Sequence, residues 1–188
     1  YRQNVARYLE VLRYMPLTQS ASQEADRMQR YEENLMNPVT TRTAAVKLEG
    51  IGIRAAESLK KGLNSSNPDV RFFAAEALAY LDEPACAEVL AKSAREIPEY
   101  RAHALTALSS LDEPISRIKL EDLLGESDSI ELRYGAFQAL RALDPEDPAI
   151  PCEMVGDQMR IFRVTAPGKP AIVVSSRERA EVVLFGRD

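Results

Sequence analysis

The chain has 188 residues, of which 45% are hydrophobic and 28% charged, an ordinary balance for a globular protein of one or two domains. No apolar run approaches the ~20 residues that span a bilayer, so the sequence predicts no membrane-spanning helix. The net charge of −5 is uneven, with +3 in residues 1–66, −9 in 67–148 and +1 in 149–188, and this acidic centre argues against nucleic acid as a partner.

The N-terminal residues 1–36 are predicted to form a helical cap. Residues 2–15 have apolar side chains at helical spacing, and Pro16 ends this helix. Its expected contacts are Val5, Leu9 and Leu12. A second, more polar helix is predicted over Ser20–Met36, with contacts through Met28, Leu35 and Met36. The chain begins at Tyr1 rather than Met and ends just after an apolar run, so we expect it to be part of a longer protein.

An internal repeat fills residues 37–148. Segments 67–84, 98–114 and 130–145 align with offsets of 30 and then 32 residues. The aligned columns are Arg71, Arg101 and Arg133; Leu78, Leu108 and Leu140; Leu81, Leu111 and Leu143; and Asp82, Asp112 and Asp144. An earlier, less regular copy begins at Asn37 and places Ala45, Leu48 and Ile51 thirty residues before their counterparts in the next copy.

Each copy is predicted to be a helical hairpin. Apolar residues recur at i, i+3 and i+6 in the first helix, and an Asp-Glu-Pro step ends it and begins the next. The second helices are predicted over 85–96 and 115–124, with Ala87, Leu90, Ala94, Leu120 and Leu123 inward. A single hairpin cannot bury its apolar face, whereas three or more stacked copies can. The predicted fold class is therefore mostly α, an α-solenoid of helical hairpins with a small C-terminal antiparallel β unit.

The β unit is predicted in residues 149–188, where the period of the apolar residues changes after Pro151. Met159–Val164 and Ala171–Ser175 flank a Pro-Gly turn and are predicted to form a β-hairpin, and Glu181–Phe185 is a predicted third strand. A unit of this size is marginal alone, so we expect it to pack on the last repeat. Its apolar edge could also pair with a strand of a partner.

Catalytic and metal-binding patterns are not found in the sequence. His103 is the single histidine, and it occupies the slot that Phe73 fills one copy earlier. Cys86 and Cys152 lie 66 residues apart, which is neither a zinc spacing nor a disulfide framework. Gly50-Ile-Gly52 lacks the third glycine and the lysine of a phosphate-binding loop. We therefore expect a protein that is not an enzyme, with no catalytic, metal-binding or cofactor-binding residues and no cofactor.

The arginine column is the strongest candidate for an interaction surface. Stacked Arg71, Arg101 and Arg133 could line a groove for an acidic partner, or each could pair with an acid of the adjacent repeat, for which Asp82 and Asp112 are the candidates. If the chain instead binds a small molecule, polar groups should converge on a pocket near Arg71, Arg101, His103 or Tyr134. The sequence leaves open whether the arginines bind a partner, pair with neighbouring acids or lie near a small-molecule pocket.

Two resemblances add expectations about fold and function. The pattern Asn-Pro-Asp-Val-Arg, then Ala-Ala-Glu-Ala-Leu, then Glu-Pro, in residues 67–84, resembles the short HEAT-like repeats named after phycobilin lyases. Such repeats serve many roles, so this resemblance implies a fold more than a function. It implies a protein-protein interaction or scaffold module, with a small-molecule-binding or lyase-like protein as the alternative.

The second resemblance is to the C-terminal part of flagellar basal-body P-ring-like proteins of planctomycete bacteria. The segments that carry it are 1–8, 67–84, 132–140 and 179–186. It implies a structural role in the periplasm or cell envelope, with flagellar basal-body or envelope proteins as partners. The P-ring portion of such a protein would precede Tyr1, and no binding residue is implied for this chain.

Overall fold

The structure is a computed structural model that describes residues 6–7, 9–11, 13, 21–112, 114–144, 152–155, 159–169, 171–177 and 180–185. The chain divides into two compact units, residues 1–116 and 117–188, and each is considered by itself. The division expected from the repeat pattern, at 36/37 and 148/149, follows sequence periodicity rather than packing and stays a prediction.

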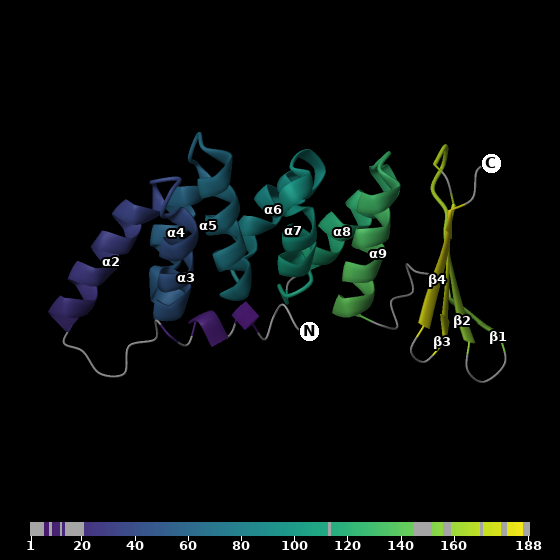
Figure 1. The fold of residues 1–188 in the computed structure, drawn as a ribbon, viewed down its shortest axis with the longest axis horizontal. Coiled ribbons are helices and arrows are strands. Elements are labelled where there is room, and N and C mark those ends of the chain that lie inside the picture. The colour runs from purple at the N-terminus through teal and green to yellow at the C-terminus, as the bar shows by residue number, and fades with distance from the viewer. Residues whose placement is uncertain are drawn as a thin grey trace. The chain divides into compact units, whose positions relative to one another are not determined.

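The first unit consists of successive helical hairpins (Figure 1). After α2, Ala21–Leu35, the first helices of the repeats are α3, Thr41–Ile51; α5, Pro68–Tyr80; and α7, Arg101–Leu108. The second helices are α4, Ala56–Leu63, and α6, Ala87–Glu96, and short 3₁₀ turns precede α4, α6 and α7 at Ile53–Ala55, Pro84–Cys86 and Pro98–Tyr100. α3 packs on α5, and α5 on α7, so the first helices form one layer of the unit. No helix among the described residues is long and apolar enough to cross a membrane.

Local chemistry explains where these helices begin. The Oδ1 atom of Asn67 accepts hydrogen bonds from the backbone amides of Asp69 and Val70 at 2.9 and 3.3 Å, and Pro68 occupies the first turn of α5. This combination satisfies amides that have no partner inside the helix. Pro84 begins the turn that leads into α6, as the Asp-Glu-Pro step predicts.

The predicted leucine and alanine columns form the core. Leu78, Leu108 and Leu111 are fully buried, and so are the inward residues Leu90 and Ala94 of α6. Burying one such leucine stabilises the fold by roughly 1.5–3 kcal/mol relative to leaving it exposed. The remaining buried hydrophobic residues of the first unit are mainly alanines, which let neighbouring helices approach closely.

An aspartate connects the ends of two successive first helices. Asp82 has a φ of 61°, the left-handed conformation that ends a helix, and its Oδ1 atom accepts a hydrogen bond of 2.8 Å from the amide of Asp112. Asp and Asn tolerate this backbone conformation better than other non-glycine residues. Asp82 therefore contributes to stacking one repeat on the next.

The N-terminal predictions hold in part. Residues 6–7 and 9–11 are helical, but Leu9 is 55% exposed, whereas Val5 and Leu12 lie outside the described residues. In the second helix Leu35 is fully buried as expected. The prediction of Met36 as a contact was wrong: it follows the end of α2 and is 42% exposed.

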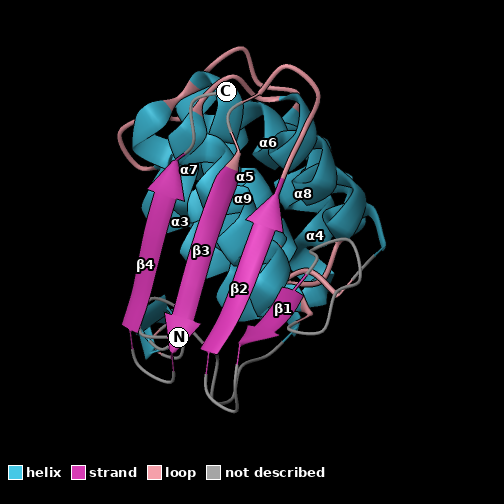
Figure 2. Cartoon of the chain, turned by 90° about the vertical axis from the view of Figure 1, so that its right-hand side faces the viewer, coloured by secondary structure: helices cyan, strands magenta, loops and turns pink. Residues whose placement is uncertain are grey.

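The second unit contains α8, Pro114–Glu126 (which begins at the end of the first unit), α9, Ile130–Leu143, and a four-stranded antiparallel sheet (Figure 2). The strands, in the order β1-β2-β3-β4, are Cys152–Val155, Met159–Val164, Ile172–Arg177 and Ala180–Phe185. The prediction of three strands was therefore incomplete, because β1 pairs with β2 and was not foreseen. Leu120 and Leu123 of α8 are fully buried, as predicted.

One face of this sheet packs on the last repeat. Phe162 and Val164 of β2 are buried opposite Val174 and Ile172 of β3, as the alternation of side chains in strands requires. The Phe162 ring lies 5.4 Å from that of Phe137 in α9. The small sheet thus obtains from the last repeat the apolar surface that it lacks on its own.

Candidate functional site

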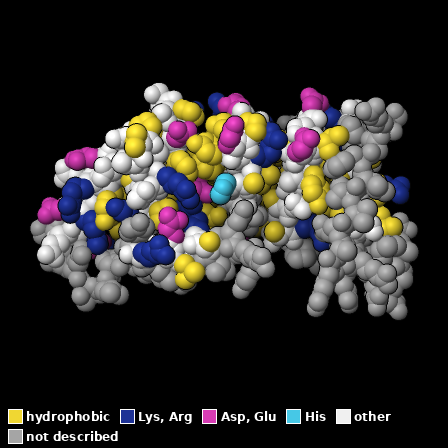
Figure 3. All heavy atoms as spheres, viewed as in Figure 1, with side chains coloured by type: hydrophobic (Ala, Val, Ile, Leu, Met, Phe, Trp, Pro, Cys, Tyr) yellow, Lys and Arg dark blue, Asp and Glu magenta, His cyan; other side chains and the backbone are white. Residues whose placement is uncertain are grey.

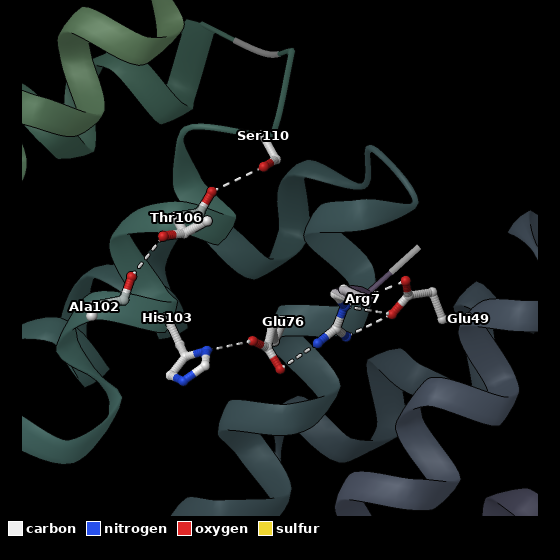
Figure 4. A network of polar contacts seen from close by, with 7 residues as sticks. All are labelled: Arg7, Glu49, Glu76, Ala102, His103, Thr106 and Ser110. Atoms are coloured by element: carbon white, nitrogen blue, oxygen red, sulfur yellow. Dashed lines mark hydrogen bonds and ion pairs between the residues drawn. The ribbon is translucent and has the colours of Figure 1, made fainter. Parts of the chain in front are cut away.

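A buried guanidinium group, that of Arg7, joins the N-terminal helix to the layer of first helices (Figure 4). Its Nη2 and Nε atoms lie 2.6 and 3.1 Å from Oε2 of Glu49, and its Nη1 atom lies 2.8 Å from Oε2 of Glu76. Glu49 belongs to α3 and Glu76 to α5. The side of the unit on which these carboxylates lie, formed by α3, α5 and α7, is called the first-helix face below.

Burial determines the electrostatics of this group. The side chains of Arg7, Glu49 and Glu76 are only 14%, 7% and 6% exposed. Burial alone would lower the pKa of Arg7, but the charges of Glu76 and Glu49 raise it above its ordinary value. Burial raises the pKa of Glu49 to about 7, although the charge and hydrogen bonds of Arg7 oppose this shift. The ion pair between Arg7 and Glu49 is thus a charge-assisted contact, but it does not fully offset the free-energy cost of removing the Glu49 charge from water.

Tyr80 and His103 complete the surroundings of the guanidinium. The Arg7 Cζ atom lies 4.4 Å from the centre of the Tyr80 ring, close enough for a cation–π contact. Burial raises the pKa of Tyr80 to about 12, so its hydroxyl stays protonated at neutral pH. His103 Nδ1 lies 3.6 Å from Oε1 of Glu76, and the imidazole is 55% exposed. We call the pocket formed by Glu49, Glu76 and Tyr80 the arginine socket.

A cleft of about 360 Å³ opens beside the socket. Phe72, Phe73 and Tyr100 form an aromatic wall, in which the rings of Phe72 and Tyr100 are stacked at 4.0 Å. The Tyr100 hydroxyl donates a 2.7 Å hydrogen bond to Asp69 Oδ1, which fixes the ring across two repeats. Arg7, Arg42, Glu76, Glu99 and His103 also line the cleft. Figure 3 shows hydrophobic, acidic and basic side chains gathered around the single histidine.

The comparisons with known proteins identify the architecture. A model of HEAT repeats matches residues 36–141, which is more than half of the chain. The chain belongs to the HEAT-repeat family. This match and the succession of helical hairpins confirm the predicted fold class, and HEAT repeats generally mediate protein-protein interactions. No curated protein matches the sequence.

The arginine column of the HEAT repeats binds backbone carbonyls. Arg71 donates to the carbonyls of Ser65 and Ser66 at 2.7 and 2.8 Å. Arg101 Nε donates to Ala94 at 3.1 Å, and Arg133 Nε donates to Leu124 at 2.9 Å. Each carbonyl lies in or just after the last turns of the preceding second helix, where carbonyls lack partners and the helix dipole favours a cation.

The prediction that this column pairs with Asp82 and Asp112 was therefore wrong. Asp82 accepts the amide of Asp112 instead, and the arginines reach back to the helix before them. Arg133 is fully buried, and burial lowers its pKa. These contacts assign the column a role in repeat stacking. Its predicted role in binding a partner stays a prediction.

The other predicted residues are dispersed. His103 lines the cleft, whereas Arg71, Arg101 and Tyr134 are not among the described residues that do so. The Tyr134 hydroxyl accepts a 2.9 Å hydrogen bond from Gln138 in the second unit. Burial raises the pKa of the Cys86 thiol to about 12, so this cysteine is unreactive as a thiolate. Among the described residues no group of three or more His, Cys, Asp or Glu side chains is placed to hold a metal ion.

The arginine socket has no signature in the repeat pattern. Arg7 lies outside the repeats, and Glu49 and Glu76 are not thirty residues apart, so no column marks them. A usable signal exists: both are charged residues within otherwise apolar segments of predicted first helices, Leu48-Glu49-Gly50-Ile51 and Ala74-Ala75-Glu76-Ala77-Leu78. Buried charges are rare unless they are paired, so such positions call for a cation from elsewhere in the chain.

Proposed function

We propose that the chain is a non-enzymatic protein-binding module and that it binds its partner on the first-helix face. One observation carries this proposal: the chain's own N-terminal helix is already bound to that face through two buried carboxylates. A surface that holds one helix with buried ion pairs and presents an aromatic cleft next to it has the features of a protein-binding groove.

The wider context of the module is also a proposal. The resemblance of the chain's ends to flagellar P-ring-like proteins supports an assignment to the periplasm or cell envelope, where the partner would be a basal-body or envelope component. The module would act there as a scaffold, because a rigid stack of repeats presents a fixed, extended surface to another protein.

Site-specific photo-crosslinking tests the proposed face. A photoreactive amino acid replaces Thr106, which lines the cleft, and in a matched control it replaces Lys92, which is 60% exposed on the second helix α6. The full chain is then irradiated in envelope extract. We expect discrete crosslinked species from position 106 alone. The same species from both positions, or none above the dark control, would contradict the proposal.

One observation favours a second candidate, a small-molecule-binding protein. The cleft brings together His103, Arg42 and Tyr80, polar groups that converge on one space as a ligand site requires. A thermal-shift screen against the full chain and the His103→Ala variant examines this alternative. A compound that raises Tm for the unmodified chain but not for the variant would support it, and a screen without any shift would remove it.

A further inference from the structure

We propose that the arginine socket is a docking site for an arginine-bearing helix of the partner, and that Arg7 occupies this site in cis until the partner replaces it. This inference rests on the proposed function and deepens it, because it states what chemistry the partner brings to the first-helix face. It also gives the N-terminal helix a role as an internal competitor.

The geometry of the socket is specific for a guanidinium group. The carboxylate of Glu49 receives two nitrogens of Arg7, Nε and Nη2, while Glu76 receives the third, Nη1. The Tyr80 ring lies 4.4 Å from the Cζ atom, as a cation–π contact requires. A guanidinium group is planar, so its in-plane N–H donors reach both carboxylates while its face contacts the Tyr80 ring. A lysine ammonium has a single charged centre and cannot make these contacts together.

The socket belongs to the repeats and not to the helix that fills it. Glu49 and Glu76 come from two packed first helices, and both carboxylates are almost completely buried. Two carboxylates face one guanidinium there, so the pocket attracts a cation whichever helix supplies it. The bound helix directs Leu9 toward solvent, at 55% exposure, so this apolar side chain does not secure it on the face.

The cleft beside the socket gives a partner an advantage over the cis helix. About 360 Å³ remains open next to Arg7, with Phe73, Tyr100 and His103 along it. A partner helix that places an arginine in the socket and an apolar side chain against the aromatic wall would bury surface that the cis helix leaves open. Arg7 competes as a tethered ligand at high effective concentration, so removing its side chain should strengthen binding in trans.

Chemical rescue tests whether the socket recognises guanidinium. The Arg7→Ala variant of the full chain lacks the atoms that N-ethylguanidinium supplies. We expect N-ethylguanidinium chloride to raise the Tm of Arg7→Ala saturably, while ethylammonium chloride at equal ionic strength does not and neither salt gives a saturable shift with the unmodified chain. Adding Glu76→Gln to Arg7→Ala should abolish the rescue. Equal effects of the two salts on Arg7→Ala would overturn the inference.

Binding in trans tests whether the occupant is exchangeable. The probe is a fluorescein-labelled peptide of residues 1–15, measured by anisotropy against the full chain, Arg7→Ala and Arg7→Lys. We expect at least tenfold tighter binding to both variants than to the unmodified chain, and loss of binding when the peptide's own Arg7 is alanine. Arg7→Lys keeps a cation in the socket, so it serves as the folded variant if Arg7→Ala unfolds.

Three results separate this inference from the proposed function. Failure of the peptide to bind either variant, while position 106 still crosslinks a partner, overturns the arginine docking site and leaves the proposed function standing. Arginine-dependent peptide binding without any crosslinked partner supports the docking site and contradicts the proposed function. The third result would be a dimer of the unmodified chain that forms with rising concentration and dissociates when the peptide is added. It would assign the socket to a second copy of the chain and so overturn the assignment to a different partner protein.

Discussion

Glu49→Gln should remove the pH dependence that this buried carboxylate imposes on the free energy of unfolding. The substitution keeps the size of the side chain and an acceptor for Arg7 but removes a charge that is 93% shielded from solvent, since the side chain is 7% exposed. Burial raises the pKa of Glu49 to about 7, from an ordinary value of 4.5. The folded chain therefore binds this proton more tightly than the unfolded chain.

The sign and size of the effect follow from this shift. Between pH 4.5 and 7 the folded state holds more protons at Glu49, so the contribution of this residue to the free energy of unfolding falls as pH rises. A difference of 2.5 pKa units at about 1.4 kcal/mol per unit gives about 3 kcal/mol. Glutamine does not titrate. The variant should therefore gain about 3 kcal/mol relative to the unmodified chain between pH 4.5 and pH 8.

Urea unfolding at pH 5, 6, 7 and 8 measures this gain, because the other carboxylates cancel in the difference between the two proteins. Glu96→Gln is the matched control, since it makes the same chemical change on α6 at a side chain that is 59% exposed. Its difference from the unmodified chain should vary far less with pH. The reasoning would be refuted if the difference in free energy of unfolding between Glu49→Gln and the unmodified chain did not change with pH. It would also be refuted if the unmodified chain became relatively more stable as pH rises, because the charge of Arg7 would then affect the pKa of Glu49 more than burial does.

The remaining predictions concern packing and helix ends, and each is measured by the free energy of unfolding. Gly62→Ala places a Cβ 2.6 Å from the Cβ of Ala74, which cannot rotate away, so we expect a loss of about 1–3 kcal/mol. An unchanged stability would show that α4 and α5 can move apart at little cost in free energy. Asp82→Ala should cost about 1 kcal/mol more than Asp82→Gly, because alanine disfavours the positive φ while both lose the contact with Asp112. Asn67→Ala should cost about 1 kcal/mol through the lost cap of α5, and an unchanged stability would mean that water replaces it.

The sequence predicted those parts of the fold that repeat. Leucines at helical spacing marked the first helices, and Leu78, Leu108 and Leu140 are fully buried. Asn67 and Pro68 open the aligned segment 67–84, and in the structure they cap α5 and occupy its first turn. The short strand β1 was missed because four residues, Cys152–Val155, carry too little alternation to stand out, and its pairing with β2 is a tertiary outcome.

The candidate site was not predicted, for a different physical reason. Arg7 forms its ion pairs with residues 42 and 69 positions away, and such contacts depend on how the N-terminal helix docks rather than on local preference. The arginine column was visible in the sequence but its partners were not. Backbone carbonyls have no sequence signature, so acids such as Asp82 were the only partners that the pattern could suggest.

The molecule thus contains two kinds of position: those that keep the same residue type between repeats and those, such as the socket residues, that differ between repeats. Columns that keep one residue type in successive copies include residues that make stacking contacts, such as the Arg71 contact with carbonyls and the Asp82 contact with the next turn. The slot of Glu76 holds Thr106 thirty residues later, and the slot of Phe73 holds His103. Because these slots differ between copies, they do not serve a contact common to all repeats. Under the proposed function they are the positions at which the first-helix face would distinguish one partner from another.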